Sequence, residues 1–128
     1  MKYFINKELK TGFEESISKV KDSLMNQGFG VITEVMMHEK LKEKLNVDYN
    51  KYVILGACNP ALAYEALKQE VNIGTMLPCN VIVREKEENV MEVVAIDPVP
   101  TMDVVENDEL KKIAIKVKEK LELALSEL

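Results

Sequence analysis

The sequence predicts an α+β fold, a single two-layer domain over residues 1–128 in which helices pack on a mixed β-sheet. Segments with apolar residues at alternate positions, typical of strands, interleave with segments whose apolar residues recur every three or four positions, typical of helices. The last two strand segments follow each other directly, as in a hairpin. The expected order is therefore β-α-β-α-β-α-β-β-α, which is not the strict alternation of a doubly wound sheet.

The length and composition suit one folded domain. The chain has 128 residues, of which 47% are hydrophobic and 30% charged. Its longest apolar runs are far shorter than the roughly 20 residues that cross a bilayer. Residues 1–8 lack the long apolar stretch of a secretory signal. We therefore expect a cytoplasmic protein that does not bind membranes.

Four elements are expected in the first part of the chain. They are a strand over 2–9, a helix over 12–26, a strand over 29–37 and a short helix over 39–45. Thr11 and Glu14 have the spacing of a capping box at the start of the first helix. Gly28 suits the end of that helix, because glycine readily adopts the left-handed conformation found there.

The central segment is the most apolar part of the chain. Residues 52–57 show no polar alternation, which is typical of a strand covered on both faces or at the centre of a sheet. Asn59 is a favourable N-cap, and Pro60 fits the first helical position, where its missing N–H costs nothing. We expect a helix over 60–70 and then a loop over 71–78.

The final part predicts a hairpin and a long helix. The hairpin strands cover 80–84 and 90–96, and the helix begins near Asn107. One apolar stripe follows this helix, formed by Leu110, Ile113, Ala114, Val117, Leu121, Ala124, Leu125 and Leu128. Ile115 and Leu123 lie off the stripe, so the helix has a second apolar surface that a neighbouring element or a second subunit would cover.

Two motifs flank the central helix. They read Gly56-Ala57-Cys58-Asn59-Pro60 and Leu77-Pro78-Cys79-Asn80-Val81, and a Gly-Phe-Gly-Val segment precedes them. In this order they resemble the domain of unknown function 302 family over nearly the whole chain. The resemblance implies a compact prokaryotic α+β domain that forms homodimers, with no established activity.

The two Cys-Asn pairs mark the expected site, and they contain both cysteines of the chain. Each pair lies where a strand meets a helix or loop. We therefore expect Cys58, Asn59, Pro78, Cys79 and Asn80 to line a site for a small molecule or a partner. The overall function, the ligand and any cofactor stay unknown at this point.

Two alternatives use the thiols chemically. Cys58 would lie just outside a helix N-terminus, where the dipole and free amides favour a thiolate. Cys58 and Cys79 are thus candidate catalytic residues of a thiol-dependent enzyme or redox sensor. With His38, the single histidine, they are also weak candidate ligands of a metal-binding module, although no Cys-x-x-Cys spacing supports one. A plainer interpretation makes both cysteines small buried hydrophobes. Whether the domain is an enzyme stays open.

The charge pattern argues against nucleic-acid binding. The net charge is −5, and lysines alternate with glutamates over 40–44 and 116–120. Such mixing is typical of a solvated helix surface, whereas binding to phosphates requires a basic face. We therefore expect no nucleic-acid partner, and a second copy of the chain is the expected macromolecular partner.

Overall fold

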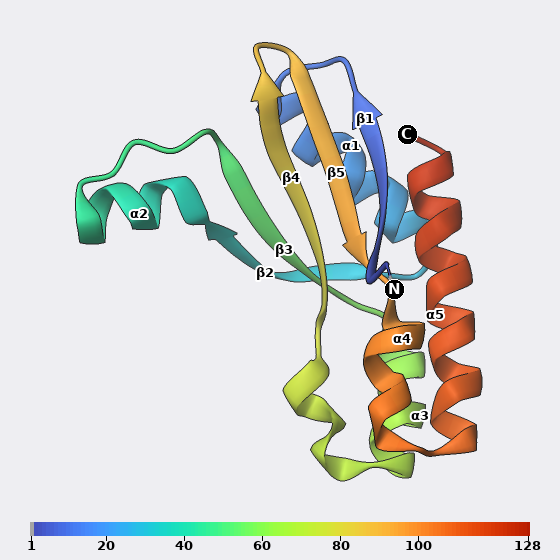
Figure 1. The fold of residues 1–128 in the computed structure, drawn as a ribbon. Coiled ribbons are helices and arrows are strands. Elements are labelled where there is room, and N and C mark those ends of the chain that lie inside the picture. The colour runs from blue at the N-terminus through green and yellow to red at the C-terminus, as the bar shows by residue number, and fades with distance from the viewer. Residues whose placement is uncertain (1) are drawn as a thin grey trace.

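The computed structural model describes residues 2–128, which form an open five-stranded sheet with helices packed on it (Figure 1). In spatial order its strands are β1 (Phe4–Leu9), β5 (Val90–Ile96), β4 (Cys79–Glu87), β3 (Tyr52–Cys58) and β2 (Gly30–Met36). The expected α+β class is confirmed. No helix within the described residues has both the length and the apolar character needed to cross a membrane.

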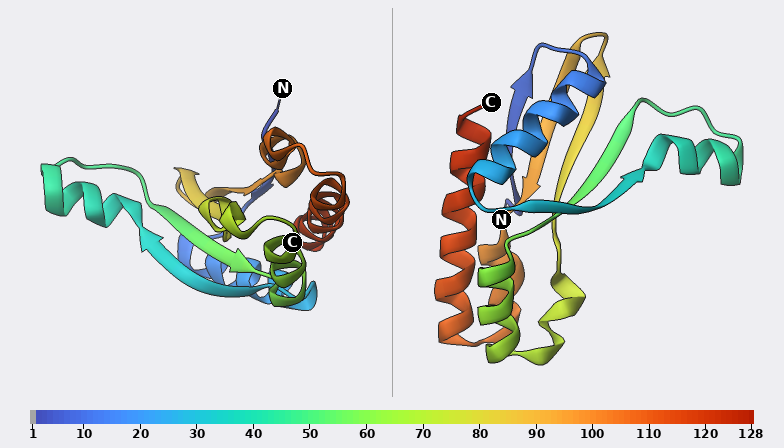
Figure 2. Two further views of the ribbon diagram at one scale, coloured as in Figure 1. Left: turned by 90° about the horizontal axis from the view of Figure 1, so that it is seen from below. Right: turned by 180° about the vertical axis from the view of Figure 1, so that it is seen from behind.

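The helices lie in two places. The set comprises α1 (Phe13–Asn26), α2 (Met37–Leu45), α3 (Pro60–Gln69), η1 (Val71–Met76), α4 (Pro98–Met102), η2 (Asp103–Val105) and α5 (Asp108–Ser126). Of these, α1 lies behind the sheet in Figure 1, and α5 runs alongside both α1 and β1. Beyond the end of the sheet lie α3, η1 and α4, next to the first half of α5 (Figure 2).

The strand pairing corrects one expectation. Every neighbouring pair of described strands is antiparallel, so the sheet is not mixed. Parallel neighbours require a connection that runs back along the sheet. Here α2 and α3 lie beyond the strand ends, so the chain reverses direction after each of them (Figure 1).

One local prediction was wrong, and one short helix was not predicted. Thr11 and Glu14 form no capping box: Gly12 is the N-cap of α1 without a side-chain hydrogen bond, and the Thr11 hydroxyl donates to the Gly12 carbonyl. The helix that was not predicted is α4, because a proline that follows a strand can either end that strand or begin a helix. In the structure Asp97 caps the Val99 amide at 3.0 Å, which allows Pro98 to begin a helix.

The described residues form two hydrophobic cores. The first core lies between the sheet, α1 and the second half of α5, and includes Leu24, Phe29, Leu55, Val81 and Leu121. The second core lies beyond the sheet and consists of Ala66, Ile73, Met102, Leu110 and Ala114. The predicted stripe of α5 is confirmed and contributes to both cores, whereas Ile115 and Leu123 are about half exposed.

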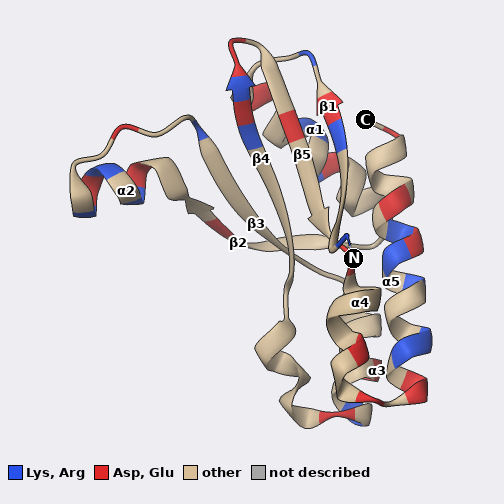
Figure 3. Ribbon diagram, in the orientation of Figure 1, with Lys and Arg blue, Asp and Glu red and all other residues tan. Residues whose placement is uncertain are grey.

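An arm built from β2, α2 and β3 projects from the body of the domain (Figures 1 and 2). Helix α2 has no buried residue, and its basic and acidic side chains alternate (Figure 3). His38, in the first turn of α2, is half-buried at the base of the arm. Its Nδ1 accepts the Tyr52 backbone N–H at 3.0 Å, and its ring meets Phe13 edge-on at 5.6 Å. His38 therefore fixes the arm to α1.

Thr33 and Pro78 lie close to the backbone of β3 at Gly56. A Cβ atom built on Gly56 would clash with the Thr33 hydroxyl and would lie 2.7 Å from Pro78 Cγ. Thr33 lies directly across from Gly56 on β2, just after a register irregularity. Glycine at position 56 thus lets Thr33 and Pro78 pack on the same strand.

We expect Gly56→Ala to lower the free energy of unfolding by about 2 kcal/mol, because an added methyl group forces neighbouring groups apart. Urea unfolding followed by circular dichroism measures this loss. Gly74→Ala is the matched control, since its Cβ would meet no atom within 4 Å. Equal stability of the two variants would contradict the close approach.

Candidate functional site

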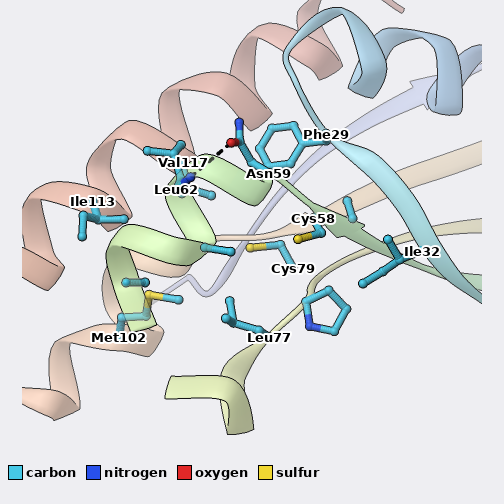
Figure 4. A pocket seen from close by; sticks show the side chains of 14 residues that line it. Phe29, Ile32, Cys58, Asn59, Leu62, Leu77, Cys79, Met102, Ile113 and Val117 are labelled. Carbon is cyan, nitrogen blue, oxygen red and sulfur yellow. Dashed lines mark hydrogen bonds between the residues drawn. The ribbon is translucent and has the colours of Figure 1, made fainter. Parts of the chain in front are cut away.

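A cavity of about 250 Å³ lies at the end of β3, where the two hydrophobic cores meet (Figure 4). Its wall is formed by Phe29, Ile32, Ala57, Cys58, Asn59, Leu62, Ala63, Ala66, Leu77, Pro78, Cys79, Met102, Ile113 and Val117. Phe29, Ala57, Cys79 and Val117 belong to the first core, whereas Ala66 and Met102 belong to the second. Asn59 is the one lining residue that is neither apolar nor sulfur-containing.

The strand-to-helix turn at Asn59 positions one side of the wall. Its Oδ1 accepts the Leu62 backbone N–H at 3.3 Å, and its Nδ2 donates to the Gln27 carbonyl at 3.5 Å. The second bond ties the turn to the end of α1, beside Gly28 with φ of +85°. The expected cap by Asn59 and the expected place of Pro60 are confirmed.

The segment between α3 and β4 positions the opposite side. The expected loop over 71–78 instead contains η1, whose Ile73 is buried in the second core. Leu77 and Pro78 follow, joined by a cis peptide bond, and both line the cavity. The chain then enters β4 with Cys79 paired to Ala57 of β3.

The fold brings the two cysteines into the same wall. Both are free thiols, and Cys58 directly follows Ala57, the residue paired with Cys79. Figure 4 shows their sulfur atoms side by side near the centre of the lining. Cys79 is buried and Cys58 is half-buried. Burial, together with the nearby Cys58, raises the pKa of the Cys79 thiol to about 11.

The expected site residues divide into two groups. Cys58, Asn59, Pro78 and Cys79 line the cavity. Asn80 does not: it is exposed and faces the other side of the sheet, because consecutive strand residues point in opposite directions.

His38 lies at the base of the arm and is absent from the cavity wall. Within residues 2–128, no group of three or more His, Cys, Asp or Glu side chains is placed to hold a metal ion. The expected combination of His38 with the two cysteines is therefore not assembled.

The lining shows what chemistry the cavity can support. Apart from the two thiols it contains no titratable side chain, so the lining supplies no general base for either cysteine. A high pKa keeps Cys79 protonated at neutral pH, which weakens it as a nucleophile. The wall is thus better suited to holding an apolar group than to activating a thiol.

Several lining residues were not predicted as part of a site. Ile113 and Val117 were recognised only as part of the α5 stripe, and no role in a site was predicted for Met102. Periodicity could place two of them on one helix face. No sequence signal indicates that this face meets the end of β3, because that contact is set by tertiary packing.

Comparisons with known proteins agree with the fold. A family model described as domain of unknown function DUF302 matches residues 5–128. The chain is also similar to a crystal structure of an uncharacterized conserved DUF302 protein from Bacillus stearothermophilus. The TM-score is 0.90, the sequences are 29% identical, and 98% of each chain is covered. No curated protein matches the chain. The resemblance based on the Cys-Asn motifs is confirmed.

We expect iodoacetamide to alkylate Cys58 faster than Cys79 in the native protein near pH 8. A pKa of about 11 in place of 9.0 gives Cys79 an about 100-fold smaller thiolate fraction, and burial further limits access. Peptide mapping by mass spectrometry at timed intervals measures both rates. In denaturant the two rates should converge. Equal rates in the native state would contradict the burial of Cys79.

Proposed function

Because the chain belongs to the DUF302 family, whose description assigns no function, we propose from the cavity that this domain binds a small apolar molecule. The observation that carries the proposal is a wall of apolar and sulfur-containing side chains at the junction of two cores. Ligand sites are typically concave and mostly apolar, with few polar groups that orient the ligand. The volume of about 250 Å³ favours a small ligand.

The chemistry of the wall defines the class of ligand. Transfer of apolar surface from water contributes roughly 25 cal/mol per Å². The Asn59 amide already bonds to the Leu62 N–H and the Gln27 carbonyl, and thiols are weak hydrogen-bond donors. A charged ligand would lose its hydration without a compensating partner. The proposed ligand is therefore uncharged and recognised mainly by its shape.

The positions of the walls support a largely preformed site. Phe29, Ala57 and Ala66 are almost fully buried, so packing fixes the inner wall. Ile32 is 63% exposed and, with half-buried Leu77 and Pro78, lies at the outer side of the lining. A fixed inner wall reduces the entropy lost on binding, and these outer residues are the proposed entry point.

We also propose that two copies associate through the open face of the sheet. This face lies opposite α1 and carries half-buried apolar side chains, which are Phe4, Ile54, Ile82, Val94 and Ile96. Arg84 and Glu92 form an ion pair of 3.3 Å on the same face. Charges of both signs allow two symmetry-related copies to meet without opposing like charges. A second copy is therefore the proposed occupant.

The thiol alternatives stay predictions. Two thiols in one wall are compatible with dithiol–disulfide exchange, which requires that the two Cα atoms lie within about 7 Å. The lining offers no base to generate a thiolate, so the apolar-ligand proposal accounts for more of the wall.

We expect the neutral dye 1-aminoanthracene to bind with increased fluorescence, and we expect Ala63→Phe to weaken binding at least about tenfold, or about 1.4 kcal/mol. Ala63 is half-buried and lines the cavity, so a phenyl ring there would fill it. Ala61→Phe, at an exposed position of the same helix, is the matched control. Absent binding to the unmodified chain, or equal binding to both variants, would exclude the proposed ligand site.

Native mass spectrometry should show a dimer of the unmodified chain and a monomer of Ile82→Lys. Placing a lysine on the open face would bury an unpaired charge in the proposed interface. Ile115→Lys is the control, because Ile115 lies on α5 and is 47% exposed. A monomeric unmodified chain would contradict the homodimer, and a dimer that persists in Ile82→Lys would contradict this choice of surface.

A further inference from the structure

We propose that Cys58, Cys79 and Met102 form a binding site for a soft monovalent metal ion, best represented by Cu(I). The three residues come from β3, β4 and α4, and all of them line the cavity. They place two thiols and one thioether around a common space (Figure 4). Thiolate and thioether sulfur are the ligands that select Cu(I). This inference goes beyond the binding of an apolar molecule and does not depend on it.

The β3–β4 pairing brings the two principal ligands together. Cys79 is the partner of Ala57, so Cys58 lies only one residue further along the neighbouring strand. Their sulfur atoms lie side by side in Figure 4. Half-buried Cys58 gives an ion access from the outer side, and buried Cys79 binds it from within. Two thiolates placed in this way suit an ion that accepts few ligands.

Met102 is the proposed third ligand. Its side chain is buried and points into the cavity from α4 (Figure 4). A methionine side chain has three rotatable bonds, which allow its sulfur to approach a bound ion without movement of the backbone. A thioether adds no charge, so Met102 would stabilise the ion without changing the charge of the site.

The rest of the wall disfavours other metal ions. It contains no imidazole or carboxylate, and the Asn59 carbonyl oxygen already accepts the Leu62 N–H. Zn(II) usually takes four nitrogen, sulfur or oxygen ligands in a tetrahedron. Mg(II) and Ca(II) require several oxygen ligands. Because the metal ligands that this wall provides are sulfur atoms, the site should prefer a soft ion.

The charges balance without a redox step. Binding of Cu(I) breaks two S–H bonds, forms two Cu–thiolate bonds and one dative bond from the Met102 thioether, and releases two protons to solvent, and the copper stays monovalent. The resulting bis-thiolate complex carries one negative charge. Cys58 immediately precedes the Asn59 cap of α3, where the helix dipole and the amides of the first turn are positive. These groups partly offset the negative charge.

Anaerobic titration of the reduced chain with Cu(I), in competition with the chelator bathocuproine disulfonate, tests the proposal. We expect one tightly bound Cu(I) per chain, near-ultraviolet absorption from sulfur-to-copper charge transfer, and no comparable binding of Zn(II). Cys58→Ser and Cys79→Ser should each abolish tight binding. Met102→Leu, which keeps the volume, should weaken binding roughly tenfold. Met76→Leu is the control, because Met76 lies outside the cavity.

A second measurement on the unmodified chain removes any dependence on the folding of the variants. Bound Cu(I) should protect both Cys58 and Cys79 from iodoacetamide, as read by peptide mapping. Alkylation of either cysteine at its metal-free rate would overturn the shared site. Failure of the chain to compete with the chelator for Cu(I) would also overturn it. Ala63→Phe distinguishes the Cu(I) proposal from the apolar-ligand proposal. This variant should reduce dye binding, while the two thiols that bind Cu(I) remain present.

Discussion

The structure depends on one apolar stripe of α5 that packs into two separate cores. Leu121 is fully buried between the sheet and α1, and Leu110 is fully buried beyond the sheet. Two polar contacts fix the helix laterally. The Ser23 hydroxyl of α1 donates to the Ala124 carbonyl, and Lys118 pairs at 2.9 Å with buried Asp97 at the end of β5. The position of α5 therefore decides where the two cores meet, and the cavity lies at that junction.

Local chemistry explains which parts of the fold could be predicted. Asn59 caps α3 as expected, and Asn107, near which the last helix was expected to begin, caps α5, because an N-cap depends on the amides two or three residues away. The strand segments were also found, since alternation of apolar residues, and the continuous apolar run of β3, are local properties of the sequence. The antiparallel pairing was not predictable, because it depends on where α2 and α3 lie in space. Pro98 was ambiguous for a different reason: a proline that ends one strand can equally begin a helix.

The candidate site shows the same division between local and tertiary information. The two Cys-Asn motifs lie at the end of the sheet, and four of the five expected residues line the cavity. Asn80 was misplaced although it has the same neighbour as Asn59. Asn59 lies in a turn, whereas Asn80 continues a strand and faces away from Cys79. Met102 was missed because its contribution depends on α4 folding back beside α3.

The meeting of two cores at one cavity also has a consequence for how the domain opens. Regions with few shared buried contacts exchange their amide hydrogens as separate cooperative units. Helices α3 and α4 belong to the smaller core, whereas the strands belong to the larger one. An occupant that touches Ala57 on one side and Ala66 on the other would join these units. An occupant of the cavity would therefore couple the opening of α3 and α4 to the opening of the sheet.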